Sequence, residues 1–200
     1  IPHIFPDEAI AEANRAVDLP LSPDTREDLR HLPIVAIDPA DARDHDDAIW
    51  AEPNGEGGYR AVVAIADVSA YVRPGGALDK EARKRGNSVY FPDRVVPMLP
   101  EVLSADVCSL VEGEDRAAMA CHMTISPEGK VTKWRFTRAL VRIAHNIAYE
   151  DAQAAVDSGN PPEHLANLWG AWKLLFAARE ARDPLDLELP ERQVRLNDEG

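Results

Sequence analysis

The residues most able to do chemistry in this sequence are the aspartates between positions 38 and 47. This stretch holds five aspartates and one arginine, hence a net charge of −4 within ten positions. Asp38 stands at the end of a short apolar run, and Asp44, Asp46 and Asp47 follow a turn signalled by Pro39. Carboxylates held close together repel one another, and without a partner they would destabilise a fold by several kcal/mol.

A divalent cation would relieve this repulsion. Mg²⁺ binds oxygen ligands in octahedral geometry and keeps several of its waters. Two such ions about 4 Å apart can activate a water and stabilise the leaving oxygen of a phosphodiester. The aspartates therefore predict a hydrolytic site for an anionic substrate, holding one or two Mg²⁺ ions.

Two other interpretations apply to such an acidic stretch. A solvated acidic loop is the commoner explanation of an isolated D-x-D-D pattern. A calcium-binding loop fails on spacing, because a loop that starts at Asp44 would place Ile49 at the glycine position and Gly55 at the position of the bidentate glutamate.

The elements that must position these aspartates follow from apolar periodicity and turn residues. Strands are expected at 33–37, 48–52 and 59–68, and a longer hairpin at 117–125 and 131–143, with an extended segment at 88–91. Helices are expected at 6–17, 22–29, 75–85, 150–156 and 163–182, and residues 194–200 read as the start of another hairpin. The expected core includes the apolar face of the last helix (Leu165, Leu168, Trp169, Trp172, Leu175, Phe176), the three methionines (Met98, Met119, Met123) and Trp134. The pattern predicts an α+β fold with a mixed or antiparallel sheet and packed helices.

Composition excludes several classes of protein. The 200 residues are 45% hydrophobic and 28% charged, and no apolar run approaches the ~18 residues of a membrane span. Cys108 and Cys121 form no C-x-x-C motif, so a disulfide framework is excluded and two buried free thiols in a reducing cytoplasm are expected. The chain opens at Ile1 with neither Met nor a signal peptide, which we interpret as a piece of a longer cytoplasmic protein.

The net charge of −13 argues against a nucleic-acid-binding domain, which is usually basic. The distribution is uneven, however, because residues 73–94 hold six cations against three acids. Five of these cations, together with Arg43 from the aspartate stretch, could contact phosphate groups: Arg73, Arg83, Lys84, Arg85 and Arg94. Solvated positions are the commoner outcome for any one of them.

Four segments together resemble the signature of the ribonuclease II / ribonuclease R family. They are Ile37–Ala48, Val63–Gly75, Arg85–Pro100 and Cys108–Leu110. They occur in the family's order and close to its spacing, and the resemblance is greatest to the bacterial ribonuclease R branch. It covers essentially the whole chain, but only the N-terminal part of the family's RNB catalytic domain.

This resemblance implies a processive exoribonuclease that works from 3′ to 5′ and releases nucleoside 5′-monophosphates with Mg²⁺. The catalytic and metal-binding aspartates would be Asp38, Asp44, Asp46 and Asp47, with Asp41 a loop acid outside the set. His45 is expected to face outward near these carboxylates without binding the metal.

The resemblance also implies RNA contacts. Tyr90 corresponds to a tyrosine that stacks on a base near the 3′ end, and Tyr149 to a second tyrosine near the RNA path. Apart from the resemblance, Arg43 and Arg85 are the two cations predicted to contact RNA. A second stacking aromatic of the family would fall near Val194, where a valine cannot stack in the same way.

The expected organisation is a helical lead-in over residues 1–32, followed by the N-terminal part of the catalytic domain over 33–200. Single-stranded RNA, the remainder of the catalytic domain and small RNA-binding domains of cold-shock and S1 type are the expected partners, with no membrane. The isolated chain is expected to be weak or inactive. The alternatives are a non-catalytic RNA-binding module that keeps the motif as a relic, and an acidic metal-binding interaction domain.

Overall fold

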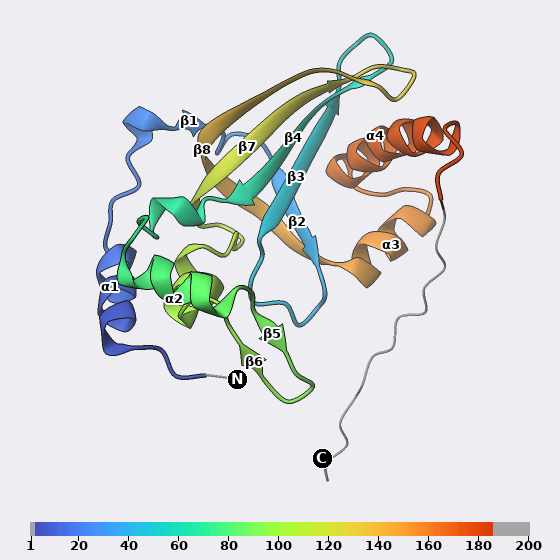
Figure 1. The fold of residues 1–200 in the computed structure, drawn as a ribbon. Helices are drawn as coiled ribbons and strands as arrows, with labels where there is room; N and C mark the ends of the chain where they lie inside the picture. The colour runs from blue at the N-terminus through green and yellow to red at the C-terminus, as the bar shows by residue number, and fades with distance from the viewer. Residues whose placement is uncertain (1–2, 186–200) are drawn as a thin grey trace.

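The computed structural model describes residues 3–185, which form a curved sheet flanked by helices (Figure 1). The helices are α1 (Asp7–Val17), α2 (Ala77–Arg85), α3 (Tyr149–Asp157) and α4 (Glu163–Glu180). The strands are β1 (Glu27–Asp28), β2 (Ile34–Asp38), β3 (Asp47–Pro53), β4 (Tyr59–Ala66), β5 (Val89–Tyr90), β6 (Val95–Val96), β7 (Asp115–Ile125) and β8 (Val131–Ala148). Short helical turns lie at Pro23–Thr25, Val68–Ala70 and Leu103–Val107.

The main sheet has the strand order β1-β8-β2-β3-β4-β7, and it closes on itself because β7 also pairs with β8. The 18-residue strand β8 makes this closure possible. It runs antiparallel to β7 as far as Arg142 and then parallel to β2 from Ile143 to Ala148. The α+β class and the mixed sheet predicted from the sequence are confirmed.

The segment 22–29 differs from the prediction, which made it a helix. It forms only a 3₁₀ turn at Pro23–Thr25 and then strand β1, whose Glu27 pairs with Ala139 of β8. The amide nitrogen of Leu29 donates to the carbonyl oxygen of Leu140 at 2.9 Å. Hydrogen bonds to a distant strand therefore overrode the local helix signals.

Helices α1 and α2 cover one end of the molecule. Ala9, Ala13 and Ala16 of α1 are buried in one cluster with Leu78 of α2 and with the 99–108 segment. Gly86 ends α2 at φ 84°, as the sequence predicted, in a conformation that side chains with a Cβ rarely adopt.

Helix α4 packs on the other end of the sheet, against β3 and β4 (Figure 1). Gly170 permits this close approach, because a Cβ there would lie 2.0 Å from the hydroxyl oxygen of Tyr59. Leu165 is buried as expected, but the prediction that the whole apolar face is core is wrong, since Trp172, Leu175 and Phe176 are exposed. The rings of Trp169, Trp172 and Phe176 stack on one another along the helix.

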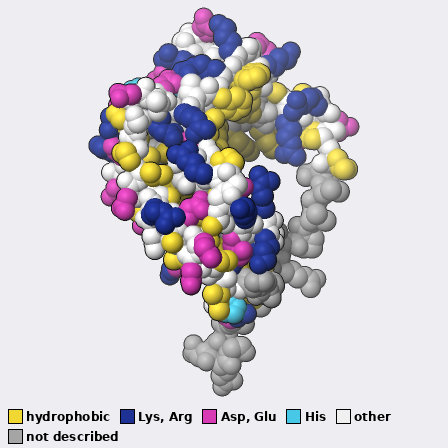
Figure 2. Space-filling view, turned by 60° about the vertical axis from the view of Figure 1, so that its left-hand side comes forward, with side chains coloured by type: hydrophobic (Ala, Val, Ile, Leu, Met, Phe, Trp, Pro, Cys, Tyr) yellow, Lys and Arg dark blue, Asp and Glu magenta, His cyan; other side chains and the backbone are white. Residues whose placement is uncertain are grey.

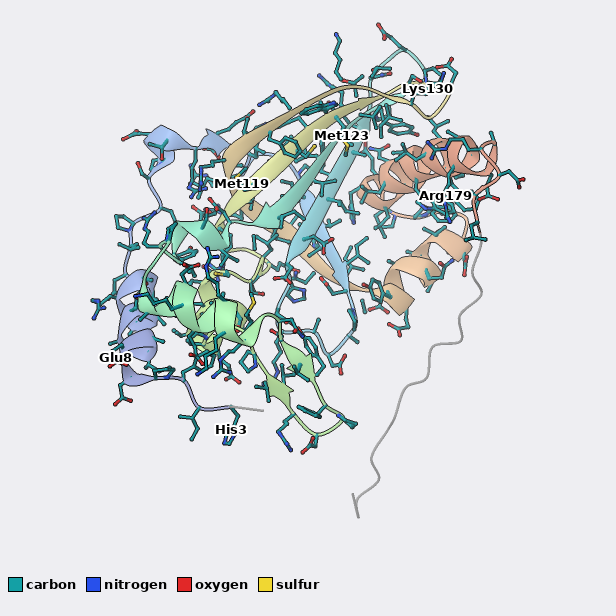
Figure 3. The ribbon with its side chains drawn as sticks, viewed as in Figure 1. His3, Glu8, Met119, Met123, Lys130 and Arg179 are labelled. Atoms are coloured by element: carbon teal, nitrogen blue, oxygen red, sulfur yellow. The ribbon has the colours of Figure 1, made fainter. Side chains whose placement is uncertain are left out.

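Trp134 was also predicted to be core and is instead 68% exposed on β8, where it lines an open groove of about 1140 Å³ on the sheet. Met119 and Met123 follow each other along β7 (Figure 3) and are half-buried, as is Met98. Both cysteines are free, with Cys108 buried and Cys121 half-buried. Within residues 3–185, no helix has the length and apolar character needed to cross a bilayer.

Candidate functional site

The aspartate-rich stretch forms the connection between β2 and β3, beside the β5–β6 hairpin (Figure 1). Asp38 is the last residue of β2 and Asp47 the first of β3. The amide nitrogen of Ala66, at the end of β4, donates to the carbonyl oxygen of Asp46 at 2.8 Å. The ends of three strands thus hold the loop that carries Asp44 and Asp46.

His45 does not face outward, contrary to our expectation. Its Nδ1 lies 2.7 Å from Oδ2 of Asp38, and its side chain is only 15% exposed. The loop curls so that an imidazole seven residues away in the chain meets the carboxylate at the strand end. His45 therefore orients Asp38, a role that the sequence alone did not indicate.

Tyr90, the last residue of β5, connects the β5–β6 hairpin to the aspartate loop. Its hydroxyl donates a hydrogen bond to Oδ2 of Asp44 at 2.7 Å. This bond to Asp44, with lesser contributions from burial and nearby carboxylates, raises the pKa of Tyr90. The ring itself remains 63% exposed, so its faces are accessible for stacking.

Asp46 lies near enough to the other three carboxylates to sense their charges. Although its side chain keeps contact with solvent, burial raises its pKa, and the negative charges of Asp44, Asp47 and Asp38 raise it further. These carboxylates are near enough to repel one another, which is the electrostatic condition under which a cation stabilises such a group.

The donor set fits a hard divalent cation, since all four side chains supply carboxylate oxygens. In residues 3–185, however, no three Asp, Glu, His or Cys groups converge on one point where they could share an ion. Asp38 is bonded to His45 and Asp44 to Tyr90. The chemistry of the residues therefore fits Mg²⁺, while in this structure Asp38 and Asp44 are hydrogen-bonded to other side chains.

The other predicted RNA contacts fall into different surroundings. Tyr149 is the first residue of α3 and follows Ala148, which pairs with Asp38 between β8 and β2. Tyr149 therefore lies at the same end of these strands as Asp38, and it is 55% exposed. Arg43 is exposed in the aspartate loop. Val194 lies outside the described residues.

Arg85 is placed differently, with a side chain only 6% exposed. Its guanidinium donates to Glu81 Oε1 and to the carbonyl oxygens of Pro97 and Ile4, and it lies over the ring of Phe5. These contacts join α2 to the N-terminal segment, so the observed role of Arg85 is structural. Arg83, Lys84 and Arg94 are exposed and paired with neighbouring acids.

One group close to the loop has no role in the sequence-based prediction. Ser109 is buried against the backbone of residues 43–45. Its signal in the sequence is its place in the Cys108–Leu110 motif, which by itself indicates no function for the serine.

The chain belongs to the RNB domain family, whose model matches residues 26–200. The match begins at residue 26, inside the helical lead-in predicted over residues 1–32. The domain boundary at residue 33 therefore stays a prediction. Among related proteins, Ribonuclease R of Vibrio parahaemolyticus is 46% identical over 182 residues, which cover 87% of this chain and 22% of that protein. The chain thus spans less than a quarter of the length of this relative.

Solved structures have the same fold. Mycoplasma genitalium RNase R in complex with ribose-methylated single-stranded RNA matches with a TM-score of 0.86 and 26% identity, over 98% of this chain and 32% of that one. Yeast Ssd1, a pseudonuclease, matches with a TM-score of 0.72 and 22% identity, over 86% of this chain and 22% of that one.

Proposed function

We propose that this chain is the aspartate-bearing part of a processive 3′-to-5′ exoribonuclease of the ribonuclease R type, acting in the cytoplasm and releasing nucleoside 5′-monophosphates. The observation that carries the proposal is the presence of Asp38, Asp44, Asp46 and Asp47 around one loop at the strand ends of an RNB-family domain. The RNA-bound state of the Mycoplasma relative supports single-stranded RNA as the substrate. The free thiols of Cys108 and Cys121 suit a reducing cytoplasm.

The four aspartates would hold one or two Mg²⁺ ions. When bound, these ions would supply an activated water and charge stabilisation for in-line hydrolysis of the terminal phosphodiester. Asp38 would be oriented for this task by His45. The exposed ring of Tyr90 would stack on a base near the 3′ end without reading its identity, because every base has a π-face. Tyr149, at the same sheet edge, would contact the RNA on its way to the site.

Other parts of the machinery would lie outside this chain. The proposal includes the remainder of the catalytic domain and RNA-binding domains of cold-shock and S1 type as partners. We therefore expect the isolated 200 residues to be weak or inactive, and the tests use the complete gene product.

The first test is Asp46→Asn in the complete gene product. With 5′-labelled single-stranded RNA and Mg²⁺, the wild type should shorten the RNA from its 3′ end, and EDTA should stop it. The variant should lose at least about 100-fold in rate, the scale of removing one electrostatic contact to a transition state. Thermal unfolding should show that the variant is folded.

Asp41→Asn is the matched control, because it removes the same charge from an exposed aspartate of the same loop. It should cleave as fast as the wild type. Wild-type turnover by Asp46→Asn would contradict the proposal.

The alternative is an RNA-binding module without catalysis, and one observation favours it: the same fold occurs in a pseudonuclease. The carboxylates argue for chemistry, since a binding surface has no need of four mutually repelling aspartates. A folded, RNA-binding wild type that never shortens RNA in Mg²⁺ would support the binding module instead.

A further inference from the structure

Ser109 lies against the backbone on both sides of Asp44, and its side chain is almost completely buried, with the residue 1% exposed. Its Oγ donates a hydrogen bond to the carbonyl oxygen of Arg43 at 3.0 Å and accepts one from the amide nitrogen of His45, also at 3.0 Å. One hydroxyl therefore binds the residue immediately before and the residue immediately after Asp44.

Ser109 is itself held in place by its neighbours. Its carbonyl oxygen accepts a hydrogen bond from Nε of Arg116 at 2.8 Å, and its amide nitrogen donates to the carbonyl oxygen of Asp106 at 3.0 Å. The next residue, Leu110, is fully buried in the sheet core and donates its amide to the carbonyl oxygen of His45 at 2.8 Å. These contacts fix the position of Ser109 relative to the core, so Ser109 does not move with the aspartate loop.

The loop is held from a second direction by β4, through the bond from Ala66 to the carbonyl oxygen of Asp46. An aspartate side chain has only two rotatable bonds, so its carboxylate position depends closely on the backbone that carries it. The bonds of Ser109 and Ala66 together therefore restrict the backbone positions from which the carboxylates of Asp44 and Asp46 project.

We propose that Ser109 is a positioning residue for the aspartate site: by binding the backbone on both sides of Asp44, it sets where the carboxylate of Asp44 would meet a divalent cation. This inference rests on the proposed function. The position requires a group that donates and accepts at once, which a hydroxyl does and a methyl group cannot. Partners that orient metal ligands typically change metal affinity about 10- to 100-fold when they are removed.

The test measures metal binding directly, without RNA or turnover. Mn²⁺ alone is titrated into the complete gene product, and the concentration of unbound Mn²⁺ is measured by electron paramagnetic resonance. Ser109→Ala should bind Mn²⁺ at least about 10-fold more weakly than the wild type.

Ile125→Val is the control for a general loss of stability, because Ile125 is buried at the far end of β7, where it pairs with Tyr59. It should lower the Tm while leaving Mn²⁺ affinity unchanged. If Ser109→Ala does not fold, Ser109→Cys carries the same expectation, since a thiol has a similar shape but bonds weakly.

Wild-type Mn²⁺ affinity in the Ser109 variant, or an equal loss of affinity in Ile125→Val, would overturn the positioning role alone. A folded wild type that binds no Mn²⁺ would overturn that role together with the proposed function.

Discussion

At the scale of single residues, the two parts of the Tyr90 side chain have different surroundings. Its hydroxyl is bonded to Asp44, and its ring remains largely open to solvent. The hydroxyl acts on the carboxylate, while the ring would act on a base. The two contributions are separable, because phenylalanine keeps the ring and loses only the hydroxyl.

Tyr90→Ala should weaken the binding of single-stranded RNA about 5- to 150-fold, which corresponds to 1–3 kcal/mol for one stacked base. Tyr90→Phe should bind with nearly wild-type affinity. Fluorescence anisotropy of a labelled oligonucleotide, with EDTA present to prevent cleavage, measures both. An equal loss in the two variants would show that the hydroxyl, and not the ring, carries the affinity.

At the scale of elements, Asp67 joins three parts of the chain directly after β4. Its carboxylate, 1% exposed, accepts hydrogen bonds from Arg26 at 2.8 Å, from Arg138 of β8 at 2.6 Å and from Ser69 at 2.6 Å. Burial alone would raise the pKa of Asp67, but the hydrogen bonds from Ser69 and Arg26 and the nearby arginine charges lower it overall. Asp67 therefore ties β8 and the residue that precedes β1 to the end of β4, the strand that also holds the aspartate loop.

Asp67→Asn should lower the free energy of unfolding at pH 7 by about 3–5 kcal/mol, because the arginines would lose a buried partner. A carboxyl group with a lowered folded-state pKa stabilises the fold above its unfolded pKa of about 4, and this stabilisation is lost as the pH falls below that value. Urea unfolding between pH 7 and pH 3 should therefore show a smaller difference between variant and wild type at the acidic end.

Asp93→Asn is the control, because Asp93 pairs with Arg94 at 2.6 Å and the side chains of both residues are well exposed. Exposed pairs contribute little to stability. A loss in Asp67→Asn no larger than in this control would contradict the buried role.

At the scale of the whole molecule, the net charge of −13 opposes RNA rather than attracting it. Figure 2 shows Lys and Arg side chains spread among Asp and Glu over the visible face, without one continuous basic patch. Under the proposed function, RNA affinity in this chain would depend on stacking and on a few local cations. Arg43 is the cation placed in the aspartate loop itself.

Arg43→Ala in the complete gene product should reduce the slope of log K against log salt concentration by about 0.7, the effect of one phosphate contact on a single strand. Arg135→Ala removes the same charge from a side chain already bonded twice to Glu27 at 2.8 Å, and the slope should stay unchanged. Anisotropy titrations over a range of KCl concentrations measure both slopes. An unchanged slope for Arg43→Ala would remove Arg43 from the RNA path.

The sequence by itself determined the family, the main strands, most of the helices and the four aspartates of the candidate site. These features depend on local patterns: apolar runs make strands, Gly86 stops a helix, and a dense group of carboxylates stands out in any chain. The aspartates' catalytic role and the stacking of Tyr90 stay predictions until the variants are measured.

Only the tertiary structure decided which partner each side chain meets. It turned His45 toward Asp38, brought Tyr90 to Asp44 across 46 positions, buried Arg85 and left Trp134 exposed. It also made a strand of residues 27–28, where local signals predicted a helix. The physical reason is that a contact between distant residues depends on how the sheet closes and how the helices pack, and no local pattern of residues contains that information.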